Sequence, residues 1–263
     1  MIDLELEDRV VVVTGGASNI GRGIVHGFAR QGAEVVLLDI DAEKAVATRD
    51  EALALGAADC RFVAADLADP GGAGTAIAAV LDLCGKIDVL VNNFGWGDPG
   101  LLLDTEAGQW DALWRMNLGA TIGCSHAALG AMRSRRRGAI VSIASDAAQG
   151  VANQSVYGAM KGGVVTFTRA IAREFGRYNI RANVVSPGIV YPGPDDAGAR
   201  SVWNRGSVVL SEKQIQDTYA LSALRRGTTP ADIAQAVLFL ASDVTARQVT
   251  GQLISVSGGW WMP

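Results

Sequence analysis

A tyrosine and a lysine stand four positions apart in the segment YGAMK, residues 157–161. Side chains at this spacing lie on one face of a helix, about 5–6 Å apart at Cβ. A phenol with its ordinary pKa of about 10 is a poor base at neutral pH. A positive charge about 4 Å away supplies about 4 kcal/mol at an effective dielectric of about 20, enough to lower that pKa by about 3 units. The pair predicts that Lys161 makes Tyr157 a usable acid or base.

A second chemical pattern lies near the N-terminus, where VVVVTGGASNIGRGI begins as a buried strand and turns through small residues into a helix. Such a turn lets backbone N–H groups approach a phosphate at the positive end of the helix. The next strand ends in Asp39, whose carboxylate can accept hydrogen bonds from a ribose 2′-hydroxyl and would repel a 2′-phosphate. Ile40 and Asp41 follow, with no Arg or Lys. The pattern favours NAD over NADP.

The elements that must position these residues alternate regularly. Apolar, β-branched runs typical of strands buried on both faces alternate with amphipathic helical patterns, which predicts a parallel, doubly wound sheet with right-handed crossovers. No linker, repeat or low-complexity tract divides the chain, so a single domain over residues 1–263 is expected. The seven expected strands are 10–14, 34–39, 60–64, 88–92, 139–143, 181–185 and 252–256, and the expected helices are 20–31, 41–55, 69–83, 109–133, 155–176 and 229–241.

Residues 187–222 break this alternation with proline- and glycine-rich turns followed by a polar helical pattern. A long irregular insertion is usually functional or mobile. In open α/β sheets the ligand lies beyond the carboxyl ends of the strands, where this segment begins. We expect a substrate lid, with an ordinary surface excursion as the alternative.

Bulk properties exclude several classes of function. The net charge of −4 gives no indication of nucleic-acid binding. No run of 18 apolar residues occurs, and the acidic N-terminus lacks the layout of a signal peptide, so a cytoplasmic protein without a membrane span is expected. The three cysteines show no metal-ligand spacing, so no metal and no disulfide is predicted.

Taken together, several separated motifs resemble those of the short-chain dehydrogenase/reductase family. They are TGGASNIG at 14–21, NNFG at 92–95, Asn117 in RMNLG, Ser145 in IVSIAS, YGAMK at 157–161 and SPG at 186–188, in the order seen in that family. The resemblance covers essentially the whole chain, including VTGQLISVSGG at 249–259. It implies a Rossmann fold and hydride transfer to or from a nicotinamide.

The resemblance also implies roles for individual residues. The catalytic residues are expected to be Ser145, Tyr157, Lys161 and Asn117, the last completing a proton relay. Asp66 and Leu67 are expected to flank the adenine ring, and Asn92 begins the element beside the ribose. The full set expected to bind NAD is Gly15, Ser18, Asn19, Ile20, Gly21, Asp39, Ile40, Asp66, Leu67, Asn93, Gly95, Tyr157, Lys161, Pro187, Gly188 and Ile189.

Some positions depart from the family's pattern. Asn19 replaces a glycine, and asparagine tolerates a positive φ better than most residues. Phe94 and Trp96 replace small residues and are expected to narrow the pocket mouth, while Pro192 replaces a threonine that often bonds the carboxamide. Ser145 precedes Tyr157 by 12 residues, one fewer than the commonest spacing. Ser142 is a weaker alternative for the serine.

The sequence thus predicts an NAD-dependent oxidoreductase that interconverts a secondary alcohol and a ketone, with a bulky or cyclic substrate. One alternative is reduction of a 3-oxoacyl thioester, and another is a nucleotide-binding module without turnover. A homotetramer or homodimer is expected through helices 109–133 and 155–176, with the apolar tail SGGWWMP at an interface. The aromatic residues Trp203, Tyr219, Trp260 and Trp261 could line the pocket or simply pack.

Overall fold

The fold is built on one parallel sheet of seven strands. The computed structural model describes residues 3–192, 196 and 211–262. The strands are β1 (Val10–Thr14), β2 (Glu34–Asp39), β3 (Asp59–Ala64), β4 (Val89–Asn92), β5 (Gly138–Ile143), β6 (Ile180–Pro187) and β7 (Leu253–Val256), in the order β3-β2-β1-β4-β5-β6-β7. The predicted doubly wound sheet is therefore confirmed.

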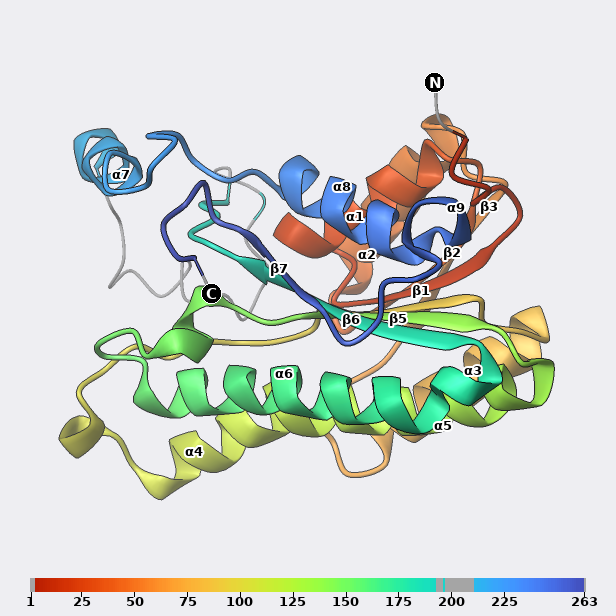
Figure 1. Cartoon of the computed structure of the whole chain (residues 1–263), viewed down its shortest axis with the longest axis horizontal. Coiled ribbons are helices and arrows are strands. Elements are labelled where there is room, and N and C mark those ends of the chain that lie inside the picture. Colours follow the sequence, from red (N-terminus) through yellow and green to blue (C-terminus); the bar gives the residue numbers. More distant parts are fainter. Residues whose placement is uncertain (1–2, 193–195, 197–210, 263) are drawn as a thin grey trace.

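Helices cover both faces of the sheet. They are α1 (Asn19–Ala29), α2 (Ala42–Ala54), α3 (Gly72–Cys84), α4 (Ala107–Leu113), α5 (Ala120–Arg135), α6 (Ser155–Phe175), α7 (Glu212–Tyr219), α8 (Pro230–Ala241) and α9 (Asp243–Ala246). In Figure 1, α3, α5 and α6 lie below the sheet, and α1 and α8 lie above it. The C-terminal ends of the strands point to the left of that view, towards α7.

Alternation along each strand explains the two layers of core. In β1, Val11 and Val13 pack with Phe28 of α1 and Leu238 of α8, whereas Val12 packs on the opposite face with Ile77 of α3. Successive side chains of a strand point to opposite faces, so a strand buried on both sides must be apolar throughout. The predicted strands therefore match the observed ones closely, although β6 continues two residues further, to Pro187.

The predicted helix 109–133 is interrupted. A π-helical turn, η2 (Trp114–Gly119), separates α4 from α5 and contains Asn117. Such turns often occur at functional sites. This turn changes the direction in which residues near Asn117 face, and the periodicity of the sequence did not reveal it.

The predicted lid, 187–222, is described only in part, because 193–195 and 197–210, with Trp203, lie outside the described residues. Within the described part, the Tyr191 and Tyr219 rings form an edge-to-face pair with centroids 5.7 Å apart. Trp261 is partly exposed and Met262 is 79% exposed. The backbone of Trp261 is held by Ser257, whose hydroxyl accepts a hydrogen bond from its N–H.

Candidate active site

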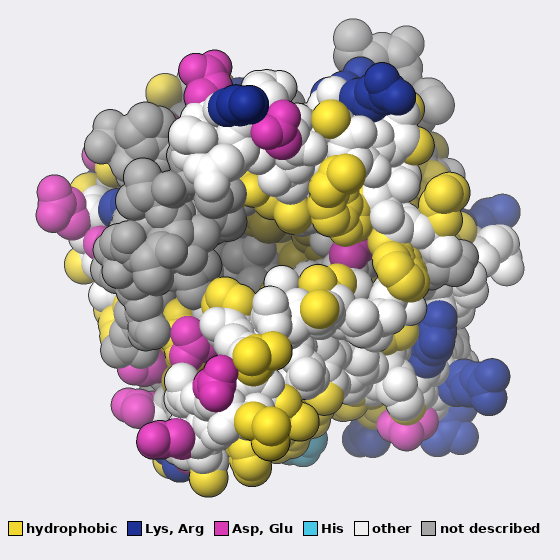
Figure 2. Space-filling model, turned by 90° about the vertical axis from the view of Figure 1, so that its left-hand side faces the viewer, with side chains coloured by type: hydrophobic (Ala, Val, Ile, Leu, Met, Phe, Trp, Pro, Cys, Tyr) yellow, Lys and Arg dark blue, Asp and Glu magenta, His cyan; other side chains and the backbone are white. Residues whose placement is uncertain are grey.

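A pocket of about 570 Å³ opens at the C-terminal ends of the strands. Its walls come from segments that follow β1 to β6, and its floor lies where the chain order reverses between β1 and β4. Parallel α/β sheets bind ligands at this kind of switch point. Figure 2 shows the hollow, with hydrophobic side chains on its rim. The volume lies within the range of about 300–1,000 Å³ typical of small-molecule sites.

The turn after β1 leaves room for an anion. Gly15 has φ of +63°, and a Cβ on Gly21 would collide with the Gly15 carbonyl oxygen. Asn19, the first residue of α1, has φ of +42°, so the asparagine adopts the conformation expected of the glycine it replaces. The Asn93 side chain donates hydrogen bonds to the carbonyl oxygens of Thr14 and Gly15, at 2.9 and 3.0 Å. The shape fits a pyrophosphate at the helix N-terminus.

A residue of the insertion after β6 touches this turn. The Asn19 N–H donates to the backbone oxygen of Asp196 at 3.1 Å and to its Oδ1 at 3.3 Å. The Arg22 guanidinium donates to the same Oδ1 at 3.1 Å. Asp196 therefore brings a carboxylate to the N-terminus of α1, at the place suited to a phosphate.

Asp39 is held firmly at the end of β2. Its carboxylate accepts hydrogen bonds from the backbone N–H groups of Ala17, Ile40 and Asp41, at 3.0, 2.8 and 3.1 Å. Both Asp39 and Asp66 line the pocket. Among the described lining residues Lys161 is the only lysine or arginine, and it lies at the other end, so the described lining of this end of the pocket is acidic.

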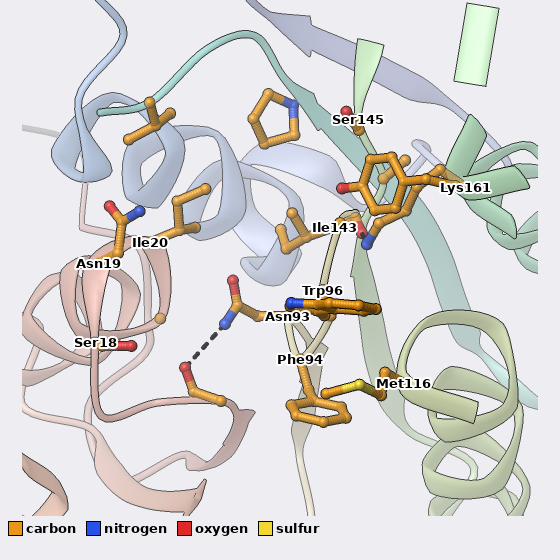
Figure 3. A pocket seen from close by; sticks show the side chains of 18 of the residues that line it. Ser18, Asn19, Ile20, Asn93, Phe94, Trp96, Met116, Ile143, Ser145 and Lys161 are labelled. Atoms are coloured by element: carbon orange, nitrogen blue, oxygen red, sulfur yellow. Dashed lines mark hydrogen bonds between the residues drawn. The ribbon is translucent and has the colours of Figure 1, made fainter. Parts of the chain in front are cut away.

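Ser145, Tyr157 and Lys161 meet at the other end of the pocket. Ser145 follows β5, whereas Tyr157 and Lys161 come from the first turns of α6. Lys161 is 3% exposed, and its Nζ donates to the Ile143 carbonyl oxygen at 3.0 Å. Figure 3 shows Ser145 and Lys161 across the pocket from Ser18, Asn19 and Ile20, with Trp96 below Lys161 and beside Asn93. Ser145 therefore lies at the site even though it precedes Tyr157 by one residue fewer than is commonest.

In the protein without a ligand, burial outweighs the one group that acts to lower the pKa of the tyrosine. Burial raises the pKa of Tyr157 to about 12, against which its hydrogen bond with Ser145 acts. Burial also lowers the pKa of Lys161 to about 8. The lowering expected from the sequence assumed a charge about 4 Å away. The Lys161 Nζ lies 5.7 Å from the Tyr157 ring centroid and donates to a carbonyl oxygen, so the lowering by Lys161 stays a prediction for the protein with its dinucleotide bound.

Asn117 lies behind the pocket wall. Its side chain is fully buried, and Nδ2 donates to the carbonyl oxygens of Trp96 and Leu113, at 2.8 and 2.9 Å. Its Oδ1 accepts from the Trp96 N–H at 3.2 Å. Gly95 sits between this side chain and Lys161, where a Cβ would come within 2.7 Å of Asn117 Oδ1 and 3.0 Å of Lys161 Nζ. In this arrangement the Asn117 side chain holds Trp96 in place.

The structure brings most of the predicted residues together. Besides Asn117, three of the residues named from the sequence do not line the pocket: Leu67, Asn92 and Ser142. Leu67 packs in the core, and the Asn92 side chain donates to Ser125 and Ser142. The predicted residues that line the pocket are Gly15, Ser18, Asn19, Ile20, Gly21, Asp39, Ile40, Asp66, Asn93, Gly95, Ser145, Tyr157, Lys161, Pro187, Gly188 and Ile189.

Further lining residues were not foreseen from the sequence. Met116 contributes a thioether, and Figure 3 shows it beside Phe94. Gln154 lies three positions before Tyr157, and Tyr191 lies just after the predicted nicotinamide segment. Helical spacing could have indicated Gln154, whereas Met116 depends on the η2 turn. Trp260 and Trp261 do not line this pocket.

The described residues contain neither a metal-binding cluster nor a membrane-spanning helix. Within 3–192, 196 and 211–262, no cluster of three histidine, cysteine or acidic residues is arranged to hold a metal ion. No helix in the same part of the chain is long and apolar enough to cross a bilayer.

The chain is similar to a known protein family and to several known enzymes. Residues 15–261 match the family model described as enoyl-(acyl carrier protein) reductase. The chain is 38% identical to (2S)-[(R)-hydroxy(phenyl)methyl]succinyl-CoA dehydrogenase subunit BbsD of Thauera aromatica, with 97% of each chain covered. It is 36% identical to D-xylose 1-dehydrogenase of Caulobacter vibrioides, covering 97% of this chain and 96% of the relative. It is 32% identical to 3-oxoacyl-[acyl-carrier-protein] reductase FabG of Chlamydia pneumoniae, covering 98% and 99%.

A solved structure shows the same fold. The crystal structure of gox2181 superimposes with a TM-score of 0.87 at 30% identity, covering 98% of this chain and 97% of that one. The sheet and the pocket at its switch point define a Rossmann-fold oxidoreductase. The family match and the relatives identify it further: the chain belongs to the short-chain dehydrogenase/reductase family, which typically uses NAD(P), and the relatives above are oxidoreductases of this family.

Proposed function

We propose that the protein is an NAD-dependent dehydrogenase or ketoreductase acting on a secondary alcohol or its ketone. The observation that carries this proposal is the meeting of Ser145, Tyr157 and Lys161 at one end of a pocket whose other end holds Asp39. A dinucleotide lying along the pocket would reach from the β2 end to the tyrosine. A nucleotide-binding module without turnover has no need of three such side chains beside its ligand.

Each side chain has a distinct task in the proposed reaction. A bound nicotinamide supplies the hydride acceptor or donor and, when oxidised, a positive charge. The Ser145 hydroxyl hydrogen-bonds the substrate oxygen, an electrostatic role. Tyr157 gives or takes the proton at its Oη. Lys161 adds positive charge when protonated, and burial, which lowers its pKa to about 8, leaves it mostly protonated at neutral pH.

The preference for NAD rests on the charge of the adenosine end. A 2′-phosphate there would meet Asp39, Asp41 and Asp66, with no lysine or arginine among the described lining residues at that end. A ribose 2′-hydroxyl could instead donate to Asp39. The electrostatics of this end therefore support NAD.

The substrate end of the pocket favours a bulky, largely apolar molecule. Trp96, Pro99, Met116 and Tyr191 contribute to its lining. Such walls bind through the burial of apolar area, about 25 cal/mol per Å². The name of the Thauera aromatica relative also describes a substrate that carries a phenyl group beside its hydroxyl.

A second candidate is a hydroxyacyl or oxoacyl thioester. The names of two of the relatives above specify a CoA ester and an acyl carrier protein. The site chemistry at Ser145 and Tyr157 would be the same for a thioester, because the reacting group is again a secondary alcohol or ketone.

A substrate panel tests the proposal. Cyclic alcohols, diols and hydroxyacyl thioesters are offered with NAD and with NADP, and reduced nicotinamide is followed by absorbance. With the best substrate, Tyr157→Phe should lose at least about 100-fold in kcat, the usual scale of general acid–base catalysis. Tyr178→Phe, which changes a tyrosine beside surface arginines, is the matched control. Unchanged turnover in Tyr157→Phe would reject the mechanism.

We also propose a cytoplasmic homotetramer or homodimer with the tail at a subunit interface. The largely exposed Met262 and the partly exposed Trp261 support an apolar contact outside the single chain. Light scattering tests this assembly, and a monodisperse monomer would contradict it.

A further inference from the structure

A buried carboxylate, Asp146, directly follows the proposed substrate-binding serine. Asp146 is 5% exposed and begins the short helix η3 (Asp146–Gln149), whose N-cap is Ser145. The Ser145 hydroxyl accepts a hydrogen bond from the Ala147 N–H at 3.2 Å. A contact that holds Asp146 in place therefore also holds the turn that orients the Ser145 hydroxyl.

Asp146 is held from the neighbouring strand. The Ser186 hydroxyl, near the end of β6, donates to Asp146 Oδ1 at 3.2 Å. Ser186 immediately precedes the segment Pro187–Ile189, which lines the pocket. The carboxylate thus joins the serine turn after β5 to the pocket segment after β6.

A third segment joins the same carboxylate. Ser257, after β7, lies near enough to act against the rise in the pKa of Asp146, while Asp146 Oδ2 itself is buried with no hydrogen-bond partner among the described residues. A Cβ on Gly188 would lie 2.9 Å from Ser257 Cα and 3.5 Å from Asp146 Oδ2, so these backbones pack closely. Ser257 in turn bonds the backbone of Trp261 in the tail. Three chain segments converge on one carboxyl group.

The carboxylate is held without a counter-charge. The groups acting on it are its own burial and the hydroxyls of Ser186 and Ser257, and no charged side chain is among them. The titratable groups in the first two turns of α6, which packs against η3, are Tyr157 and Lys161, and the Lys161 Nζ donates to the Ile143 carbonyl oxygen. Burial accordingly raises the pKa of Asp146 to about 6. An uncompensated buried carboxylate costs stability, so a residue of this kind usually has another role.

Resting on the function proposed above, we infer that Asp146 is a positioning residue that clamps the Ser145 turn to the Ser186–Ile189 segment. The clamp sets the distance between the hydroxyl that holds the substrate oxygen and the segment expected beside the nicotinamide. The ionised carboxylate accepts from the Ser186 hydroxyl. Protonation weakens this bond, because charge-assisted hydrogen bonds are roughly twice as strong as neutral ones.

The clamp can be tested without cofactor or substrate. In Asp146→Asn and in Ser186→Ala, amide hydrogen exchange should accelerate at least about threefold in both 145–149 and 186–189. Exchange in the phosphate turn, 15–21, should stay as in the wild type. Ser142→Ala, a buried serine of β5 that bonds Asn92 instead, is the matched control and should leave both segments unchanged. Unchanged exchange in Asp146→Asn and Ser186→Ala would overturn the inference.

Kinetics then separate positioning from a general structural role. Asp146→Asn should lower kcat about tenfold and remove the limb near pH 6 from the pH profile of kcat. Ser186→Ala should lower kcat less and keep that limb, because Asp146 still titrates. The Asn variant should melt no lower than the wild type at pH 7.5, since it removes a buried charge. A lower melting temperature with an unaltered pH profile would show a structural role and overturn the inference.

The two proposals fail separately. If the wild type turned over no alcohol or ketone with either cofactor, the proposed function would be wrong, whereas the exchange data would still report on the clamp. If the wild type were active and Asp146→Asn kept its kcat and pH profile, only the clamp would be wrong.

Discussion

The Asn117 side chain brackets the backbone of Trp96, accepting from its N–H at 3.2 Å and donating to its carbonyl at 2.8 Å. The two residues lie on different elements, η2 and the loop after β4. The π-helical turn aims Asn117 at the loop, while Gly95 leaves the space that both Asn117 and Lys161 need. The buried Asn117 side chain thereby fixes Trp96, an aromatic wall of the pocket, relative to α6.

We predict that Asn117→Ala destabilises the fold and loosens this wall. The change removes the hydrogen bonds that Asn117 makes with the N–H and C=O of Trp96 and with the Leu113 carbonyl, and each such bond contributes about 1 kcal/mol. The free energy of unfolding should fall by about 2–4 kcal/mol in urea titrations. KM for an apolar substrate should rise. Asn179→Ala, at an exposed turn, is the control, although its φ of +59° makes a small loss expected there too. A loss for Asn117→Ala no larger than that of Asn179→Ala would contradict the role of the bracket.

Local sequence patterns were sufficient for the sheet and for the residues that line the β1–β2 end of the pocket. Strand β1 is apolar throughout because helices cover both of its faces. Gly15 and Gly21 are required by contacts within one turn. Asp39 stands at the end of its strand, and strand ends meet at one edge of a parallel sheet. These features depend on neighbours in sequence, so a pattern can reveal them.

The contacts that the sequence did not reveal lie between distant segments. The orientation of Asn117 follows from a π-helical turn and a bond to Trp96, 21 residues earlier. The position of Asp146 follows from Ser186, 40 residues later. Leu67 was assigned by its neighbour Asp66, yet it turns into the core. Periodicity says which face a side chain occupies, but not which distant atom it meets.

We predict that the buried Lys161 ammonium destabilises the fold and that Lys161→Met stabilises it. Its folded pKa, about 8, lies below the usual value of 10.5, so the unfolded chain binds more protons between these two pH values. The contribution of this group therefore becomes more favourable as the pH rises from about 8 to 10.5, and its penalty is complete below about pH 8. At pH 7 the free energy of unfolding of the variant should exceed that of the wild type by about 2–3 kcal/mol, while turnover is lost.

Urea titrations at pH 7 and pH 10.5 check this prediction. The difference between Lys161→Met and the wild type should shrink towards zero at the higher pH. Lys213→Met, at an exposed position of α7, should change the free energy of unfolding by less than about 0.5 kcal/mol at both pH values. A variant less stable than the wild type at pH 7 would show that the bond from Nζ to Ile143 outweighs the desolvation of the ammonium.

Replacing Asp39 should change the choice of cofactor. Asp39→Ser removes the negative charge that a 2′-phosphate would meet and the acceptor for a ribose 2′-hydroxyl. We expect kcat/KM with NAD to fall about 10–100-fold, corresponding to the loss of one or two charge-assisted hydrogen bonds, and kcat/KM with NADP to rise. Asp59→Asn, at the opposite end of the neighbouring strand, is the control. An unchanged ratio between the two cofactors would show that Asp39 serves only its three backbone contacts.

The contact of Asp196 with the N-terminus of α1 should weaken dinucleotide binding. The carboxylate lies on the Asn19 N–H and on Arg22, where a pyrophosphate would be expected, so two negative groups compete for one positive end of a helix. Asp196→Asn should lower the Kd for NAD about two- to fivefold, the effect of about 0.3–1 kcal/mol of helix-terminus electrostatics. Calorimetric titration at low and high salt measures it, and the gain should shrink as salt screens the charges. Glu212→Gln, an acid in the first turn of α7, removes the same charge elsewhere and should leave the Kd unchanged. Weaker binding by Asp196→Asn would mean that the carboxylate helps to order the phosphate turn and does not compete with the ligand.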